Sequence, residues 1–182
     1  TDISCWGDST GQAVVTVIGG QFPYTHLWDN GETNAIISNL YNGVDSCKYH
    51  TVISTDANGC TIIDSVEICH INPQIQATID SLNVSCFNGC DGWASITSTG
   101  GVLSHTYNWS NGHVGILQHD TAFNLCFGSY YVIIEDDVGC RVIDSVRISQ
   151  PTKLYAQATY VAHVTCNGFD NGIAHASGIG GT

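Results

Sequence analysis

Nine cysteines are the residues of this chain most suited to covalent chemistry. No two of them have the Cys-x-x-Cys spacing of a zinc or dithiol redox site, which leaves disulfide formation as the expected chemistry. Disulfides persist in oxidising compartments, so the protein is expected outside the cell or on its surface. No apolar run reaches the ~18 residues of a membrane helix. No signal peptide is recognisable either, so we expect a mature fragment whose export signal lies elsewhere.

Five of the nine cysteines recur at an offset of about 80 residues. Asp-x-x-Gly-Cys occurs at 56–60 and returns at 136–140, and a shift of about 80 residues superposes further positions, which indicates tandem domains. The superposed groups are Cys5, Cys86 and Cys166; Gly19-Gly20, Gly100-Gly101 and Gly180-Gly181; and Trp28 and Trp109. We therefore expect copy one at 1–72 with its first strand truncated, copy two at 73–150, and a partial copy three at 151–182.

Hairpin geometry and the repeat together predict the cysteine pairs. A hairpin tip near Asn58 places Cys47 opposite Cys69. Repeat equivalence is satisfied most economically by pairs inside each copy, and the two cysteines then left in copy two pair with each other. The expected disulfides are Cys5–Cys60, Cys47–Cys69, Cys86–Cys140 and Cys90–Cys126. Cys166 is expected to have its partner beyond Thr182.

Catalysis is not expected. The histidines are His26, His50, His70, His105, His113, His119, His163 and His175, and none recurs at the same place in both full copies. No H-E-x-x-H motif exists and no serine sits in a nucleophile elbow, so no catalytic residue is assigned. The net charge of −12, with four Lys and Arg in total, argues against nucleic acid and anionic membranes as partners.

Metal binding is the other chemistry to weigh. Loops rich in Asp, Asn and Gly could offer oxygen ligands to Ca²⁺, and they lie at 29–31, 56–59, 135–139 and 167–172. None matches an EF-hand loop, and turns use the same residue types, so the turn interpretation is favoured and no metal or other cofactor is assigned.

The elements that must position these residues are strands. Runs rich in Val, Ile, Thr and Tyr lie at 12–18, 49–55, 61–68, 130–136 and 141–148, separated by turn signals such as Asn-Gly. No segment holds a helical apolar period. We expect an all-β fold of β-sandwich domains with Trp28 and Trp109 in the cores, and Trp6 and Trp93 partly exposed.

The order of these residues resembles the SprB repeat of surface adhesins in gliding Bacteroidota. Copy one carries the pattern as Cys5, Gly11, Gly19-Gly20, Pro23-Tyr24, Trp28, Gly31, Leu40, Gly43, Asp56, Gly59, Cys60 and Pro73. Copy two carries it as Cys86, Gly89, Asp91-Gly92, Gly100-Gly101, Trp109, Gly112, Leu125, Gly128, Tyr130, Val132, Asp136, Gly139, Cys140 and Pro151. Copy two departs from it at Ser104-His105, where Pro-Tyr is expected.

The resemblance implies tandem immunoglobulin-like domains of about 80 residues, type IX secretion, and a stalk or spacer role in a cell-surface filament that serves adhesion or gliding motility. The expected partners are neighbouring repeats, other copies in a filament, and surface glycans, host, prey or substratum. The alternative is an array of carbohydrate- or protein-binding modules with contacts in variable loops or at repeat junctions.

The resemblance also implies O-linked glycans. Bacteria that export such proteins modify Asp followed by Ser or Thr and then a small or branched apolar residue. The matching acceptors are Ser9, Ser65, Ser81, Thr121 and Ser145. Strand parity turns Ser65 and Ser145 toward solvent, whereas it places Asp64 and Asp144 on the core side, which is costly for a charge unless the sheet edge exposes them.

Overall fold

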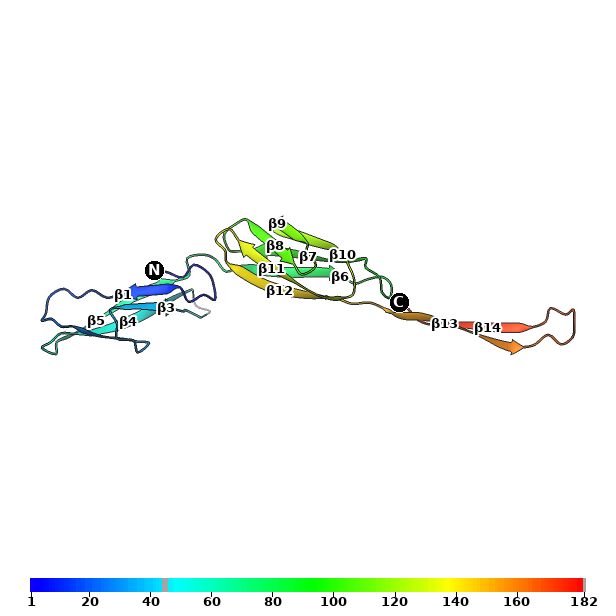
Figure 1. Ribbon diagram of the computed structural model, residues 1–182, viewed down its shortest axis with the longest axis horizontal. Helices are drawn as coiled ribbons and strands as arrows, with labels where there is room; N and C mark the ends of the chain where they lie inside the picture. The colour runs from blue at the N-terminus through cyan, green and yellow to red at the C-terminus, as the bar shows by residue number, and fades with distance from the viewer. Residues whose placement is uncertain (44–45, 182) are drawn as a thin grey trace. The chain divides into compact units, whose positions relative to one another are not determined.

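A computed structural model describes residues 1–43 and 46–181, and within them the regular secondary structure consists of strands, β1 to β14, and one isolated bridge between Ile3 and His70. The all-β prediction is confirmed (Figure 1). Four of the strand runs expected from sequence correspond to β4, β5, β11 and β12, whereas the run expected at 12–18 overlaps β1 only at 12–14. No helix in the described part of the chain is long and apolar enough to cross a membrane.

Copy one forms two antiparallel sheets. The first pairs β1 (Gly11–Val14) with β3 (Ile36–Leu40), and the second has the order β2 (Thr25–Trp28), β4 (Cys47–Thr55), β5 (Thr61–Cys69). The side chains between them form one core of Ile3, Ala13, Trp28, Ile37, Leu40, Val52 and Ile68. Trp28 is 3% exposed, as the sequence predicts for a core tryptophan.

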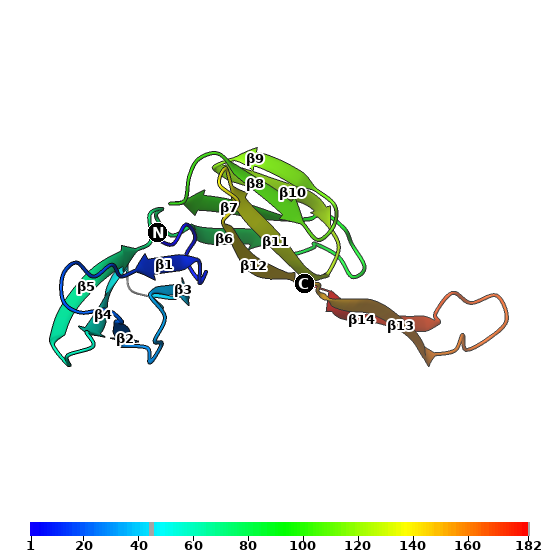
Figure 2. The ribbon, with the colours of Figure 1, turned by 60° about the vertical axis from the view of Figure 1, so that its left-hand side comes forward.

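Copy two has the strand order of an immunoglobulin-like sandwich. One sheet is β10 (His119–Leu125), β7 (Gly92–Thr99), β6 (Gln76–Leu82), and the other is β12 (Arg141–Ile148), β11 (Gly128–Asp136), β8 (His105–Trp109), β9 (Val114–Leu117). The fourth strand in chain order therefore joins the sheet of strands three, six and seven, as the C′ strand does in variable-type domains (Figure 2). Trp109, on the third strand, is 4% exposed.

Residues of copy three form the hairpin of β13 (Thr152–Ala162) and β14 (Ile173–Gly181). Side chains of both strands are exposed almost throughout the hairpin, which Figure 1 draws in orange and red.

Contacts divide the described chain into two compact units that do not follow the copy boundaries expected at 72 and 150. Unit 1 comprises Thr1–Gln76, Thr99–His105 and Glu135–Val142, and unit 2 comprises Ala77–Ser98, Thr106–Ile134 and Ile143–Thr182. The Gly-Gly loop and the Asp-x-x-Gly-Cys hairpin of copy two therefore belong to the unit that holds copy one. The copy boundaries stay a prediction.

Candidate functional site

The Asp-x-x-Gly-Cys segments, which we call tips (56–60 and 136–140), are hairpin ends organised around their aspartates. In the second tip Oδ1 of Asp136 accepts the N–H groups of Val138 (3.0 Å) and Cys140 (2.9 Å), and Oδ2 accepts that of Val102 (2.9 Å). The Asp136 N–H donates to the Cys140 carbonyl. One carboxylate thus fixes the direction of the cysteine and ties the tip to the Gly-Gly loop.

The first tip repeats this arrangement. Oδ1 of Asp56 accepts the N–H groups of Asn58 (2.9 Å) and Cys60 (2.8 Å), and Oδ2 accepts that of Gln21 (3.0 Å). The N–H of Gln21 and then that of Cys60 lower the pKa of Asp56, because both stabilise the carboxylate. The Asp56 and Asp136 carboxylate oxygens, which the sequence offered to Ca²⁺, therefore accept hydrogen bonds from backbone N–H groups.

Metal-ligating side chains converge at one place in the described residues, where Cys47, Glu67 and Cys69 lie together. Both cysteines are bonded to each other in a disulfide, so neither supplies a thiolate.

Two of the expected disulfides are present. Cys47 and Cys69 face each other in the β4–β5 register and are bonded, and Cys90 is bonded to Cys126. In both pairs the short sequence separations, 22 and 36 residues, keep the partners inside one copy.

The expected Cys5–Cys60 and Cys86–Cys140 pairs are wrong. Cys5 is bonded to Cys140, with a Cα–Cα distance of 5.3 Å and a sequence separation of 135 residues. Cys60, Cys86 and Cys166 are exposed thiols. The disulfide therefore joins copy one to the tip of copy two.

Strand length explains why Cys5 cannot reach the tip of its own copy. Ile3 donates its N–H to the Cys69 carbonyl (2.8 Å), so Cys5 lies near the C-terminal end of β5, whereas Cys60 precedes the N-terminal end. A strand of 9 residues spans about 30 Å. Disulfides need Cα atoms within roughly 7 Å of each other. The second tip belongs to the same compact unit as Cys5 and is the tip that bonds to it.

Aromatic and amide side chains surround the Cys5–Cys140 bond. Trp6 stacks on His70 with ring centroids 4.3 Å apart, and its Nε1–H donates to the Asn72 carbonyl (2.8 Å). Asn72 Nδ2 in turn donates to the Ser4 carbonyl (2.9 Å). Cys140 is 8% exposed.

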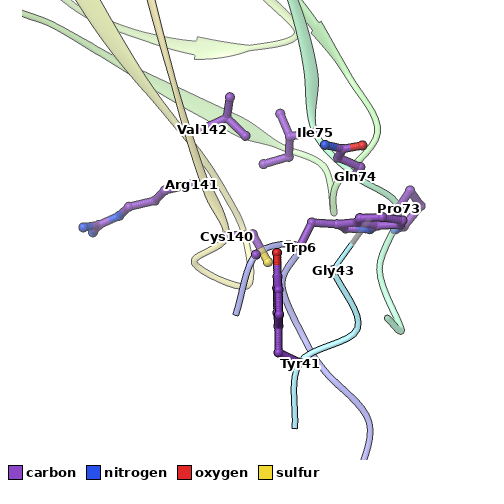
Figure 3. A pocket seen from close by; sticks show the side chains of 10 residues that line it. Trp6, Tyr41, Gly43, Pro73, Gln74, Ile75, Cys140, Arg141 and Val142 are labelled. Atoms are coloured by element: carbon purple, nitrogen blue, oxygen red, sulfur yellow. The ribbon is translucent and has the colours of Figure 1, made fainter. Parts of the chain in front are cut away.

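A cavity of about 240 Å³ opens beside this bond (Figure 3). Its wall includes Trp6, Tyr41, Pro73, Ile75, Cys140 and Arg141. Trp6 is half-buried, as its sequence context predicts, whereas Tyr41 is 51% exposed. The cavity therefore presents aromatic surface to solvent next to a covalent staple.

One comparison with known proteins agrees with the sequence pattern. The family model of the SprB repeat matches residues 1–33 and 78–114. The resemblance to the SprB repeat is confirmed. No curated protein matches the chain. A solved structure, described as the amphioxus IgVJ-C2 molecule, is 16% identical with a TM-score of 0.32, and the alignment covers 81% of this chain and 100% of that one.

The geometry explains the Gly-Gly pairs of the SprB pattern. Its Gly-Gly pairs all have positive φ, between 58° and 92° at 19–20, 100–101 and 180–181, which favours glycine. A Cβ on Gly101 would lie 2.7 Å from Cγ1 of Ile75 and 2.9 Å from the Asp136 carboxylate. Glycine here lets the loop approach the tip closely enough for the Val102–Asp136 hydrogen bond.

The candidate glycan acceptors are spread over the surface. Ser9, Ser65 and Ser145 are exposed, and Ser81 and Thr121 are half-buried. Three of them share one geometry, in which the preceding aspartate accepts the serine N–H at 2.7–2.8 Å: Asp64–Ser65, Asp80–Ser81 and Asp144–Ser145. All three lie on edge strands, namely β5, β6 and β12. The Asp-Ser pair thus places a carboxylate on an edge N–H, which opposes pairing with other strands.

Proposed function

We propose that this chain is a structural segment of a secreted cell-surface filament or adhesin, in which SprB repeats act as a stalk or spacer. The observation that carries the proposal is the Cys5–Cys140 disulfide, because it places a covalent bond between two copies of the repeat. A stalk must transmit tension without unravelling, and a cross-copy disulfide prevents the segment between its two cysteines from extending. The disulfides and the SprB match support an extracellular, cell-surface location, and type IX secretion is what the SprB resemblance implies.

Pulling on single molecules tests this role. The chain is tethered at its two ends and stretched in optical tweezers, first oxidised and then with a thiol reductant. We expect a shorter extension at full unfolding for the oxidised chain, because the 135-residue separation between Cys5 and Cys140 stays closed. Equal extensions in both states would contradict a load-bearing disulfide and with it the stalk role.

The cavity beside Trp6 supports a second candidate, a carbohydrate-binding module. Half-exposed aromatic rings commonly provide the apolar part of ligand sites, and Tyr41 and Trp6 both line this cavity. Glycan-array screening compares the wild-type chain with Tyr41→Ala. Binding that the Tyr41 variant loses would favour the module, and Tyr24→Ala, outside the cavity, serves as the matched control.

Glycosylation belongs to the same proposal. Sugar on exposed Ser65 and Ser145 would shield two edge strands that already carry the Asp-Ser geometry. The intact mass of native material, measured before and after mild β-elimination, tests it. A mass equal to that of the bare polypeptide with its disulfides would rule the modification out.

A further inference from the structure

The unbonded cysteines occupy the same two kinds of position as the bonded pair. Cys5 begins a turn, and Cys86 and Cys166 are its repeat equivalents; we call these the turn cysteines. Cys140 ends a tip, and Cys60 is its equivalent. One turn cysteine and one tip cysteine are bonded to each other, and the remaining three are exposed thiols.

The three turns have the same backbone geometry. In each, the carbonyl of the cysteine accepts the N–H of the residue three positions on, and the residue two positions on has positive φ. The hydrogen bonds are Cys5–Asp8 (3.2 Å), Cys86–Gly89 (2.9 Å) and Cys166–Phe169 (3.2 Å), with φ of 90° at Gly7, 59° at Asn88 and 90° at Gly168. Cys86 and Cys166 are thus presented on the same kind of turn as the bonded Cys5.

The two tips also match. The aspartate of each tip accepts the N–H of its cysteine at 2.8 Å in the first and 2.9 Å in the second, and donates its own N–H to the cysteine carbonyl at 3.0 Å in both. Cys60 is therefore held as Cys140 is held, while it remains exposed and lines a cavity with Gly19 and Gly20.

Cys86 has the same relation to its own copy as Cys5. Val84 donates its N–H to the Ser149 carbonyl (3.1 Å), so Cys86 lies near the C-terminal end of β12, whereas Cys140 precedes the N-terminal end. The length of β12, 8 residues or about 26 Å, excludes a bond inside copy two.

The surroundings of Cys86 repeat those of Cys5. Its cavity, of about 510 Å³, is lined by Phe87, Pro151 and Lys153, which are the repeat equivalents of Trp6, Pro73 and Ile75 in the cavity beside Cys5. The first cavity is about 240 Å³ and has Cys140, Arg141 and Val142 in its wall. The larger cavity is therefore lined by the repeat-equivalent positions, but its lining contains no residues of a tip.

We propose that each turn cysteine forms a disulfide with the tip cysteine of the copy that follows it. Cys86 and Cys166 would then bond to tip cysteines of later copies of this repeat, and Cys60 would bond to the turn cysteine of an earlier copy. Each bond forms from two thiols, and their two protons and two electrons pass to a disulfide oxidant, which leaves as two thiols. Overlapping staples of this kind would join every copy of an array to its neighbour. The proposal rests on repeat geometry and holds whether the array is a stalk or a set of binding modules.

A chain extended by one tip tests the proposal. Residues 103–150 are fused after Thr182, which completes copy three with an added tip cysteine; the added equivalent of Cys126 is replaced by serine because position 170 offers it no partner. The chain is refolded with oxidised and reduced glutathione, its thiols are alkylated, and its disulfides are mapped by peptide mass spectrometry. The same extension with Cys140→Ser in the added segment is the control.

The expected result is a new disulfide between Cys86 and the added tip cysteine, with Cys60 and Cys166 alkylated. The control should leave Cys86 alkylated as well. A bond between Cys166 and the added tip would show pairing inside one copy and overturn the proposal. An unbonded added tip, in a chain whose Cys5–Cys140, Cys47–Cys69 and Cys90–Cys126 bonds have formed, would overturn it too.

In the unextended chain, Cys140→Ser provides a second measurement. We expect Cys5 to become an alkylatable thiol, since the tip of its own copy lies beyond β5. A Cys5–Cys60 bond in this variant would contradict the assignment of partners to successive copies.

Discussion

The two tips have the same sequence pattern and the same hydrogen bonds, but their cysteines are in different chemical states. Cys140 is 8% exposed and bonded to Cys5, whereas Cys60 is an exposed thiol. Local residues therefore determine the shape of a tip, and a segment distant in sequence determines whether its cysteine is oxidised. The predictions below change one member of an equivalent pair and use the other as its control.

Removal of the Cys5–Cys140 disulfide should have the largest effect on stability. Closing a loop of 135 residues stabilises the folded state by about 5 kcal/mol in the chain-entropy description. We expect the double variant Cys5→Ser/Cys140→Ser to lose most of this from the free energy of unfolding, measured in urea with Trp fluorescence. Cys60→Ser, at the equivalent tip position, should change it by less than about 0.5 kcal/mol. Equal losses of unfolding free energy in the two variants would mean that the Cys5–Cys140 disulfide contributes no stability of its own.

The Gly-Gly loops provide the second contrast. A Cβ on Gly100 would lie 1.9 Å from the Gln74 carbonyl oxygen, whereas a Cβ on Gly19 would meet no atom within 4 Å, and both have positive φ. Gly19→Ala should cost about 1 kcal/mol for the backbone conformation alone. Gly100→Ala should cost about 3 kcal/mol more from overpacking against backbone. Urea unfolding of the two variants measures the difference, and similar values would show that the Gln74 segment moves aside easily.

The core tryptophans provide a smaller contrast. Trp109 Nε1–H donates to the Asp120 carboxylate at 2.8 Å, and Asp120 also faces His113 Nε2 at 3.1 Å. Trp28 Nε1–H donates to the Asn34 carbonyl at 2.9 Å. Because hydrogen bonds to charged acceptors contribute more, Trp109→Phe should destabilise by about 1 kcal/mol more than Trp28→Phe. Thermal unfolding followed by near-UV circular dichroism can resolve this, and a larger loss in Trp28→Phe would contradict it.

The sequence was sufficient for features that depend on local order. The β4–β5 hairpin and its tip predict that Cys47 faces Cys69, and the register confirms it. The all-β class, the core tryptophans and the strand runs follow from residue type and period in the same way.

Repeat equivalence could not assign the remaining partners. A shift of about 80 residues identifies which cysteines are equivalent, but pairs within a copy and pairs between successive copies satisfy it equally. Only the length of β5, which separates Cys5 from Cys60, decides between them. The hydrogen bonds of the tip aspartates, those within the Asp-Ser pairs and the position of strand β9 could not be predicted, because each depends on which strands become neighbours.

The smallest expected difference between the two copies is the loss of stability at alkaline pH, which is caused by Tyr107 in the core of copy two. Tyr107 is 0% exposed and shares a hydrogen bond with the Ser98 hydroxyl; burial, with a further contribution from the Asp120 charge, raises the pKa of Tyr107 above its usual 10.0. The repeat equivalent in copy one is His26, so copy one has no phenol at this position. The folded state of copy two therefore holds the phenol proton more tightly than the unfolded state does. Its contribution to stability is complete below pH 10 and is lost as the pH rises through the raised folded pKa.

Urea unfolding at pH values from 8 to 11.5 measures this loss, with Tyr107→Phe as the matched variant. We expect the free energy of unfolding of wild-type copy two to fall more steeply above pH 10 than that of Tyr107→Phe, although the variant starts lower because Ser98 loses its partner hydroxyl. Tyr24→Phe removes a half-buried phenol of copy one that donates to the Gly19 carbonyl, and it should leave the alkaline slope of copy two unchanged. Parallel slopes in wild type and Tyr107→Phe would show that the buried phenol ionises as readily folded as unfolded, so that the two cores would not differ in their response to pH at this position.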